Sequence, residues 1–191
     1  MKERIVETSI QLFDRKGFRG TSIKEIVEEL NVTKGTFYYY FKSKEELLKD
    51  IHITYIDNLI EQQKLILEDS KKDCTDKLYN LIYMVISNIR SNLESARIFT
   101  REVRHLSGKH VEEIKAKRNL FRQRYQELIE KGIRQGEFKN TIPADMLTFG
   151  ILGIINWTYY WYNPDGEISE QELAQMFTNL ILNGVKNDKL S

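Results

Sequence analysis

The sequence predicts an all-α protein of about nine helices. Apolar residues recur at helical spacing along almost the whole chain, capping boxes precede several apolar runs, and no stretch alternates apolar and polar residues as a strand would. A chain of 191 residues with 41% hydrophobic and 30% charged residues can bury a core, and its net charge of +1 excludes neither DNA nor a small molecule as a partner. No apolar run approaches the roughly 18 residues of a membrane helix, and the N-terminus lacks the apolar core of a secretion signal. We therefore expect a cytoplasmic protein.

Three short helices are expected at the start of the chain. Residues 5–13 place apolar side chains on one helical face, and Gly17 ends this helix because glycine readily adopts a left-handed conformation. Residues 22–25 form a capping box for a second helix of about eight residues. Residues 33–41 then form a third short helix, with a threonine as its cap.

Longer helices are expected in the rest of the chain. A capping box at residues 43–46 opens a helix of about 25 residues. Further helices are expected at about 75–92, from a cap at Ser91, from about residue 108 to Gly136, at 142–162, and from Ser169 to about Lys186. We expect residues 1–46 to form one domain and residues 47–191 a second.

The third predicted helix carries five consecutive aromatic residues, FYYYF, at positions 37–41. Phe37 and Phe41 lie one turn apart, so both can pack against the first two helices. Tyr38 and Tyr40 project to either side, where their hydroxyls can donate to phosphate oxygens. Tyr39 points furthest from the core. Such a cluster alone is more often core than contact surface.

The start of the same helix carries small or hydrogen-bonding residues, which a recognition helix needs in order to approach base edges in the major groove. Lys34 can donate to guanine O6 or N7, Gly35 permits close approach, and Thr36 can contact a base edge or a thymine methyl. Ser22 and Lys44 lie at the N-termini of the second and fourth helices, where free backbone N–H groups favour a phosphate. The sequence therefore predicts a DNA-binding surface.

The helix-turn-helix signature of the TetR family of bacterial transcriptional regulators resembles one stretch of this chain, TSIKEIVEELNVTKGTFYYYFKSKEEL. The resemblance covers about residues 2–50, with GFRGTSI, NVTKGTFYYYF and FKSKEEL in the family's order and spacing. It implies base contacts from Lys34, Gly35 and Thr36 and phosphate contacts from Ser22, Tyr38, Tyr40 and Lys44, with Thr33 and Thr21 as weaker candidates.

The resemblance also implies a homodimer in which the last two helices of each copy form a four-helix bundle, and no cofactor. Gly150 and Gly153 would allow close helix approach, and the final helix carries an apolar stripe, although any core helix also shows one. The expected interface residues are Gly150, Gly153, Phe177, Leu180, Ile181 and Gly184. Two-fold symmetry predicts a palindromic operator.

Aromatic residues and cations in the C-terminal part indicate an anionic effector with an apolar tail. The segment NWTYYWYNPDG, residues 156–166, resembles the TetR subgroup that senses acyl-CoA thioesters in fatty-acid and sterol breakdown. Residues 97–110 supply the cations. The expected effector contacts are Arg101, Arg104, Asn156, Trp157, Tyr160 and Trp161. Core and interface packing, with a solvated basic face, is the alternative for the same residues.

The predicted function is a ligand-responsive repressor, in which an effector enters beside the fourth helix and changes the distance between the two recognition helices. A regulator of an efflux or stress operon that senses a hydrophobic drug-like molecule is the alternative. A metal-dependent helical enzyme is the remote alternative, with a metal site at His105 and His110 and with Glu102 and Glu113 nearby, but the spacing of the histidines is not a ligand motif. An enzyme is not expected, because the chain has no phosphate-binding glycine loop and no nucleophile elbow. A DNA-packaging protein would leave the last 140 or so residues unexplained.

Overall fold

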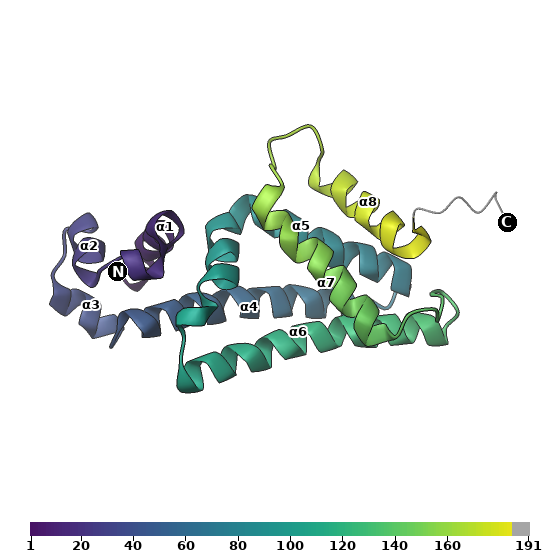
Figure 1. Cartoon of the computed structure of the whole chain (residues 1–191), viewed down its shortest axis with the longest axis horizontal. Coiled ribbons are helices and arrows are strands. Elements are labelled where there is room, and N and C mark those ends of the chain that lie inside the picture. Colours follow the sequence, from purple (N-terminus) through teal and green to yellow (C-terminus); the bar gives the residue numbers. More distant parts are fainter. Residues whose placement is uncertain (185–191) are drawn as a thin grey trace. The chain divides into compact units, whose positions relative to one another are not determined.

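A computed structural model of the chain describes residues 1–184, and within that range it contains helices and turns but no strand (Figure 1). The elements are α1 (Lys2–Gly20), α2 (Ile23–Glu29), α3 (Lys34–Tyr40), α4 (Lys44–Glu68), α5 (Cys74–Arg101), the 3-10 turn η1 (Val103–His105), α6 (Gly108–Arg134), α7 (Ala144–Trp161) and α8 (Glu170–Asn183). The all-α prediction is confirmed. None of the helices in residues 1–184 has the length and apolarity to cross a membrane. The predicted end of the last helix at Lys186 lies outside the described residues.

At one place where the sequence predicts a boundary between two helices, the structure has a kink within a single helix. A helix was expected to end near residue 92 and a new one to be capped by Ser91, yet α5 continues from Cys74 to Arg101. Asn92 within it has φ −138° and ψ 29°, which is not helical. Asparagine competes for nearby backbone hydrogen bonds, so it can break the helical ladder locally without ending the helix. Residues 1–184 therefore contain eight α-helices instead of nine.

The chain forms two compact units. The first, which we call the head unit, combines Met1–Asn58 with Asn92–Arg118. The second unit combines Leu59–Ser91 with the described part of Asn119–Ser191. The segment 92–118 thus belongs to the same unit as α1, α2 and α3. The domain division at residues 46 and 47 remains a separate prediction, and α4 runs unbroken through it.

The core of the head unit joins its first three helices to α4 and to the segment 92–118. Phe37 is 0% exposed and its ring centroid lies 5.9 Å from that of the buried Phe41, so the prediction that these two rings are core is confirmed. Burying a phenylalanine side chain stabilises a fold by about 1.5–3 kcal/mol. The other buried members of this cluster are Ile5, Leu12, Phe13, Ile26, Val27, Leu30, Leu47, Leu48, Ile51, Ile98, Leu106 and Ile114.

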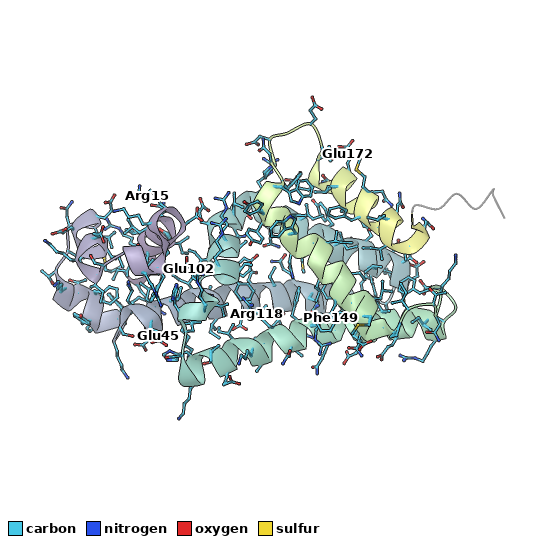
Figure 2. All side chains as sticks on the ribbon, viewed as in Figure 1. Arg15, Glu45, Glu102, Arg118, Phe149 and Glu172 are labelled. Atoms are coloured by element: carbon cyan, nitrogen blue, oxygen red, sulfur yellow. The ribbon has the colours of Figure 1, made fainter. Side chains whose placement is uncertain are left out.

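The second unit has its own core around Tyr125, whose side chain is fully buried. Its hydroxyl donates to the carbonyl oxygen of Leu81 at 3.1 Å, and burial raises the pKa of this phenol. In the same unit, Arg90 binds Asp165, within the turn between α7 and α8, and Glu170, the first residue of α8. A capping box between Ser169 and Glu172 then starts α8, as the sequence predicts; Glu172 is labelled in Figure 2.

Candidate nucleic-acid interface

Three backbone features shape the turns that connect α1, α2 and α3. Gly17 has φ +76°, a conformation that residues with a side chain rarely adopt, and it interrupts α1 where the sequence predicts an end. Ser22 caps α2 through a reciprocal capping box with Glu25. Asn31, just after α2, has φ +53°, which asparagine tolerates better than most residues. These turns present α3 on the surface of the head unit.

Thr21 is a structural residue of the first turn. Its side chain is buried, with 1% of the residue exposed, and its hydroxyl donates to the carbonyl oxygens of Leu12 and Gly17 at 3.2 and 3.0 Å. The weak prediction of a DNA contact from Thr21 is therefore wrong, because its only side-chain donor is used inside the fold.

The first turn of α3 is open where the sequence predicts base contacts. Thr33 caps the helix by accepting a hydrogen bond from the backbone N–H of Thr36 at 3.2 Å. Lys34 and Gly35 are exposed, and a Cβ built on Gly35 would meet only the Thr33 hydroxyl, at 3.4 Å. Thr36 is half-buried, and its hydroxyl lies 3.2 Å from that of Thr33. Lys34 and Gly35 thus form the most accessible part of this turn.

The three tyrosines of α3 surround the buried phenylalanine pair on the outside. Tyr39 is 82% exposed and points furthest from the core, as predicted. Tyr38 and Tyr40 are also exposed; the first packs edge-on against Phe37 at 5.6 Å and the second edge-on against Tyr39 at 4.9 Å. Each of these rings thus packs against another ring and is still exposed, which leaves it available for a phosphate contact.

The side chain of Lys44 has a structural role that the sequence does not reveal. Its amine donates to the carbonyl oxygens of Phe18, at 2.6 Å, and Thr21, and lies over the Phe18 ring, 4.3 Å from the centroid. Burial lowers the pKa of this amine. Lys44 therefore stabilises the turn between α1 and α2, and a phosphate contact at this position would use its backbone N–H.

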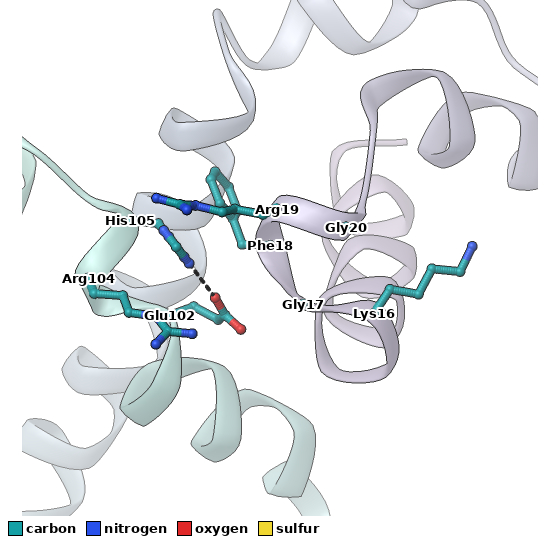
Figure 3. A pocket seen from close by; sticks show the side chains of 8 residues that line it. All are labelled: Lys16, Gly17, Phe18, Arg19, Gly20, Glu102, Arg104 and His105. Carbon is teal, nitrogen blue, oxygen red and sulfur yellow. Dashed lines mark ion pairs between the residues drawn. The ribbon is translucent and has the colours of Figure 1, made fainter.

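The segment 92–118 contacts α1 inside the head unit. Phe18 stacks on His105 with ring centroids 5.4 Å apart, and the His105 imidazole lies 3.2 Å from the Glu102 carboxylate. Asp14 forms an ion pair with Arg97 at 3.2 Å. Beside these contacts lies an open pocket of about 430 Å³ (Figure 3), lined by Lys16, Gly17, Phe18, Arg19, Gly20, Glu102, Arg104 and His105.

The same segment also contacts the start of α4. The backbone N–H and hydroxyl of Ser107 both donate to Glu45 at 2.9 Å, and these bonds lower the pKa of Glu45. His110 lies 3.3 Å from the same carboxylate. Within the head unit, the segment 92–118 is thus bonded both to α1 and to α4, and no local pattern in the sequence could have shown either contact.

The two histidines considered for a metal site therefore have other partners. His105 contacts Glu102 and His110 contacts Glu45. Within residues 1–184, no group of three or more histidine, cysteine, aspartate or glutamate side chains is arranged to hold a metal ion.

The predicted effector contacts are divided between the two units. Arg101 and Arg104 are exposed residues of the head unit. Asn156, Trp157, Tyr160 and Trp161 lie on α7 in the second unit; Trp157 is 56% exposed and stacks on the exposed Tyr160 ring at 4.8 Å. In a single chain, these rings face outward.

The exposed rings of α7 are part of a larger apolar surface in the second unit. Gly150 and Gly153 are exposed, and a Cβ built on either would meet no atom within 4 Å. The predicted interface residues Phe177 and Ile181 are half-buried on α8, while Leu180 and Gly184 are exposed. The large exposed apolar side chains of α7 and α8 are Met146, Phe149, Trp157, Tyr160, Trp161, Met176 and Leu180.

Comparison with known proteins gives a consistent picture. The family described as "Bacterial regulatory proteins, tetR family" matches residues 5–51, and the family described as "Tetracyclin repressor-like, C-terminal domain" matches residues 71–185. The HTH-type transcriptional repressor KstR2 of Rhodococcus jostii (strain RHA1) is 24% identical over 186 residues, which cover 96% of this chain and 90% of that protein.

Solved structures share the fold over almost the whole chain. The TetR family transcriptional regulator PfmR from Thermus thermophilus gives a TM-score of 0.88 at 25% identity. The match covers 96% of this chain and 100% of PfmR. AibR in complex with isovaleryl coenzyme A and operator DNA gives a TM-score of 0.85 at 23% identity, covering 95% of this chain and 97% of that one.

Proposed function

This chain belongs to the TetR family of bacterial transcriptional regulators, and from that premise we propose that it is a cytoplasmic, ligand-responsive repressor that binds a palindromic operator as a homodimer. The family consists of regulators and not enzymes, so the expectation that the chain has no catalytic activity is confirmed. The observation that carries the proposal is the surface of α3: an open first turn and exposed tyrosines, supported from below by the buried Phe37 and Phe41.

We assign the DNA contacts to the exposed surface around α3. Lys34, Gly35 and Thr36 contact base edges in the major groove, with the Lys34 amine as the donor that distinguishes one base from another. The positioning contacts to phosphates come from Ser22, Tyr38, Tyr40 and the backbone N–H of Lys44, with Thr33 as a weaker contributor. Phosphate contacts hold the head on the duplex, whereas base contacts select the sequence.

The homodimer uses the apolar surface of α7 and α8. A monomeric protein rarely exposes so many large apolar side chains on neighbouring turns of two helices, and a second copy of the same surface covers them by two-fold symmetry. The open space at Gly150 and Gly153 allows another helix to approach closely. Phe177, Leu180, Ile181 and Gly184 extend this surface along α8. Two recognition helices related by this symmetry require a palindromic site.

The effector is an amphiphile of the acyl-CoA class. Support comes from the solved complex of AibR with isovaleryl coenzyme A, whose fold matches 95% of this chain. Arg101 and Arg104 are our candidates for positive charge near such a ligand, Trp157, Tyr160 and Trp161 are our candidates for aromatic contact, and Asn156 is our candidate for a polar contact. Because the rings of α7 are exposed in one chain, a ligand that reaches them does so at the surface that we assign to the dimer.

Effector binding releases the operator by moving α4. The first turn of α4 carries Lys44, which is bonded to the turn between α1 and α2, and Glu45, which is bonded to Ser107. A displacement of α4 therefore acts directly on the turn between α1 and α2 and on the segment 92–118. Such coupling between two sites typically amounts to about 1–3 kcal/mol, or a 5- to 150-fold loss of operator affinity.

The test begins with selection of duplexes from a random pool by the purified protein. We expect an enriched palindrome that binds at least about a thousandfold more tightly than random duplex at the same salt concentration. Replacing Lys34 with alanine should relax the base preference within each half-site. Decanoyl-CoA should then release the selected duplex. An intact fold with no sequence preference would disprove the proposal.

A further inference from the structure

Four side chains from three helices meet inside the head unit in a cluster that we call the polar anchor: His52 and Tyr55 from α4, Phe99 from α5 and Arg118 from α6. The Phe99 ring is at its centre. The imidazole of His52 lies 5.5 Å from it, the ring of Tyr55 lies 5.0 Å from it, and the guanidinium carbon of Arg118 lies 4.1 Å from it.

Arg118 is a half-buried cation that has no counter-ion among residues 1–184. Its Nη2 donates to the carbonyl oxygen of Phe99, whereas its Nε is buried and has no hydrogen-bond partner in that range. No carboxylate of the described chain forms an ion pair with it, while the neighbouring Lys117 pairs with Asp57. Burial lowers the pKa of Arg118, and no nearby acid offsets this effect. Burying an unpaired charge is costly, so such groups are normally paired.

His52 has the opposite unsatisfied group, a hydrogen-bond acceptor that no donor of the described residues reaches. The residue is 0% exposed, and its Nδ1 lies 2.9 Å from the carbonyl oxygen of Leu48. Because a carbonyl oxygen can only accept, Nδ1 carries the proton and Nε2 presents a lone pair. Nε2 is buried and has no partner in the described part of the chain. Burial, and to a lesser extent the charge of Arg118, lowers the pKa of His52 to about 4, so the ring is neutral at pH 7.

We propose that the polar anchor binds the polar end of the effector, an acyl compound that offers an oxygen acceptor to Nε of Arg118 and an O–H or N–H donor to Nε2 of His52. The inference rests on the proposed function, since it assigns the chemical class of the effector and residues that sequence patterns did not reveal. A hydroxy carboxylic acid meets both requirements. So does an acyl-CoA, with a thioester carbonyl as the acceptor and a pantetheine amide as the donor.

A simple carboxylate fits less well than a ligand that carries both groups. It would pair with Arg118 but would face the lone pair of His52. Protonating His52 would remove that conflict, yet with a pKa of about 4 this costs about a thousandfold in affinity at pH 7. The anchor therefore distinguishes an acyl chain with a donor next to its acceptor from one without.

The anchor is placed where ligand binding can reach the DNA-binding surface. Tyr55, Phe99 and Arg118 are only half-buried, whereas His52 is fully buried. His52 is eight residues from Lys44 on the same helix, about two turns. A ligand bound to both His52 and Arg118 links α4 to α6. It therefore acts on the helix whose Lys44 stabilises the turn between α1 and α2.

The direct test is calorimetric titration of the full chain, without DNA, with 3-hydroxydecanoate, decanoate and decanoyl-CoA. We expect 3-hydroxydecanoate or decanoyl-CoA to bind at least tenfold more tightly than decanoate. Arg118→Met should weaken binding of every probe by about 10- to 100-fold, because it removes a charged donor. His52→Phe should weaken binding of the two donor-bearing probes by about tenfold and should not weaken binding of decanoate, because it removes the lone pair that a carboxylate faces. The matched control is Lys117→Met, at the preceding position of α6, and this variant should bind all probes like the wild type.

A measurement on the unaltered protein covers the case in which a variant fails to fold. In a ¹⁵N spectrum, Nε2 of His52 should appear as an unprotonated nitrogen, and 3-hydroxydecanoate or decanoyl-CoA should shift its resonance upfield as it accepts a hydrogen bond. An unchanged resonance at saturating probe, or wild-type affinity in folded Arg118→Met, would overturn the inference. So would tighter binding of decanoate than of both donor-bearing probes.

Operator binding separates this inference from the proposed function. If the wild type selects a palindrome but no probe binds at millimolar concentration, the repressor proposal stands and the anchor is wrong. If the probes bind as expected but no duplex is selected, the anchor stands and the repressor proposal is wrong.

Discussion

Both α3 and α7 expose aromatic rings, but the two helices surround those rings with different chemistry. On α3 the exposed rings are all tyrosines, and they follow a helix start with an exposed lysine and glycine. On α7 the exposed rings of Trp157 and Tyr160 stack on each other, in a surface that also contains methionine, phenylalanine and, on α8, leucine side chains. The first surface suits a polar, negatively charged partner, and the second suits another apolar surface.

The difference teaches that an exposed ring is not by itself a sign of function. What decides its role is whether hydrogen-bond donors or further apolar atoms lie around it. The tyrosines of α3 depend on the buried Phe37 of the same helix and on Phe41, the residue that caps its end. The rings of α7 lie on a helix whose other face is buried in its own unit. Substitutions on each helix should therefore have different consequences.

The largest expected effect comes from removing the support under the α3 tyrosines. Phe37→Ala should lower the free energy of unfolding by about 3–5 kcal/mol, because it leaves a cavity in the core of the head unit. Urea denaturation followed by circular dichroism measures this loss. Tyr39→Ala is the matched control on the same helix, and since this ring is mostly exposed its effect should stay within about 0.5 kcal/mol. Equal effects of the two substitutions would contradict the division of α3 into a buried and an exposed face.

The next largest effect tests the apolar surface of α7 and α8. Leu180→Glu should weaken the dimer about 100-fold, or by about 2.8 kcal/mol, because it places a charge in an interface that excludes water. Sedimentation equilibrium measures the dissociation constant. The exposed Lys64→Glu on α4 is the control for a change of charge and should leave the dimer unchanged. If the Leu180→Glu protein has the same dimer dissociation constant as the wild type, the homodimer uses another surface.

Helical periodicity predicted most of the fold, because the signals that start and end helices are local. The capping boxes at Ser22 and Ser169 could be read from residues within four positions of each other, and so could the division of residues 37–41 into buried phenylalanines and exposed tyrosines. The boundary expected at Ser91 was wrong for the same reason. A local break in the pattern cannot tell a helix end from a kink when the hydrogen-bonded ladder resumes beyond it.

Contacts between distant residues could not be predicted. The amine of Lys44 bonds to a carbonyl 26 positions earlier, and Ser107 bonds to a carboxylate 62 positions earlier. Neither pairing has a pattern at short range, so the inclusion of the segment 92–118 in the head unit remained hidden. The same holds for the unpaired nitrogens of His52 and Arg118, since an unsatisfied atom is defined only by what surrounds it in space.

The imidazole ring of His52 differs from the exposed rings of both α3 and α7, because it carries polar atoms but is fully buried. Its pKa in the folded chain, about 4, lies below the ordinary value of about 6.5, so the unfolded chain binds the proton more readily between these two values. Stability should therefore be fully present above about pH 6.5 and should fall as the pH drops towards 4. His52→Phe should lose this contribution, so that between pH 7 and 4.5 it loses about 2 kcal/mol less stability than the wild type.

Urea denaturation of both proteins at each pH gives this difference directly. The acidic groups whose pKa values are lowered, such as Glu25 and Glu45, are present in both proteins, so their effects cancel in the comparison. Parallel loss of stability in the wild type and in His52→Phe would mean that His52 is not the buried neutral ring described above.

The smallest effect concerns a single hydroxyl at the surface of α3. Tyr38→Phe keeps the ring and its edge-on contact with Phe37 but removes the donor that we assign to a phosphate. Affinity for the selected operator and for random duplex should fall by the same amount, about 1 kcal/mol, because a phosphate contact carries no sequence information. Fluorescence anisotropy at fixed salt measures both affinities. Tyr39→Phe, which removes a hydroxyl to which we assign no contact, should change neither. A loss confined to the operator would instead place Tyr38 at a base edge, and the polar surface of α3 would then read sequence with its rings as well as with its first turn.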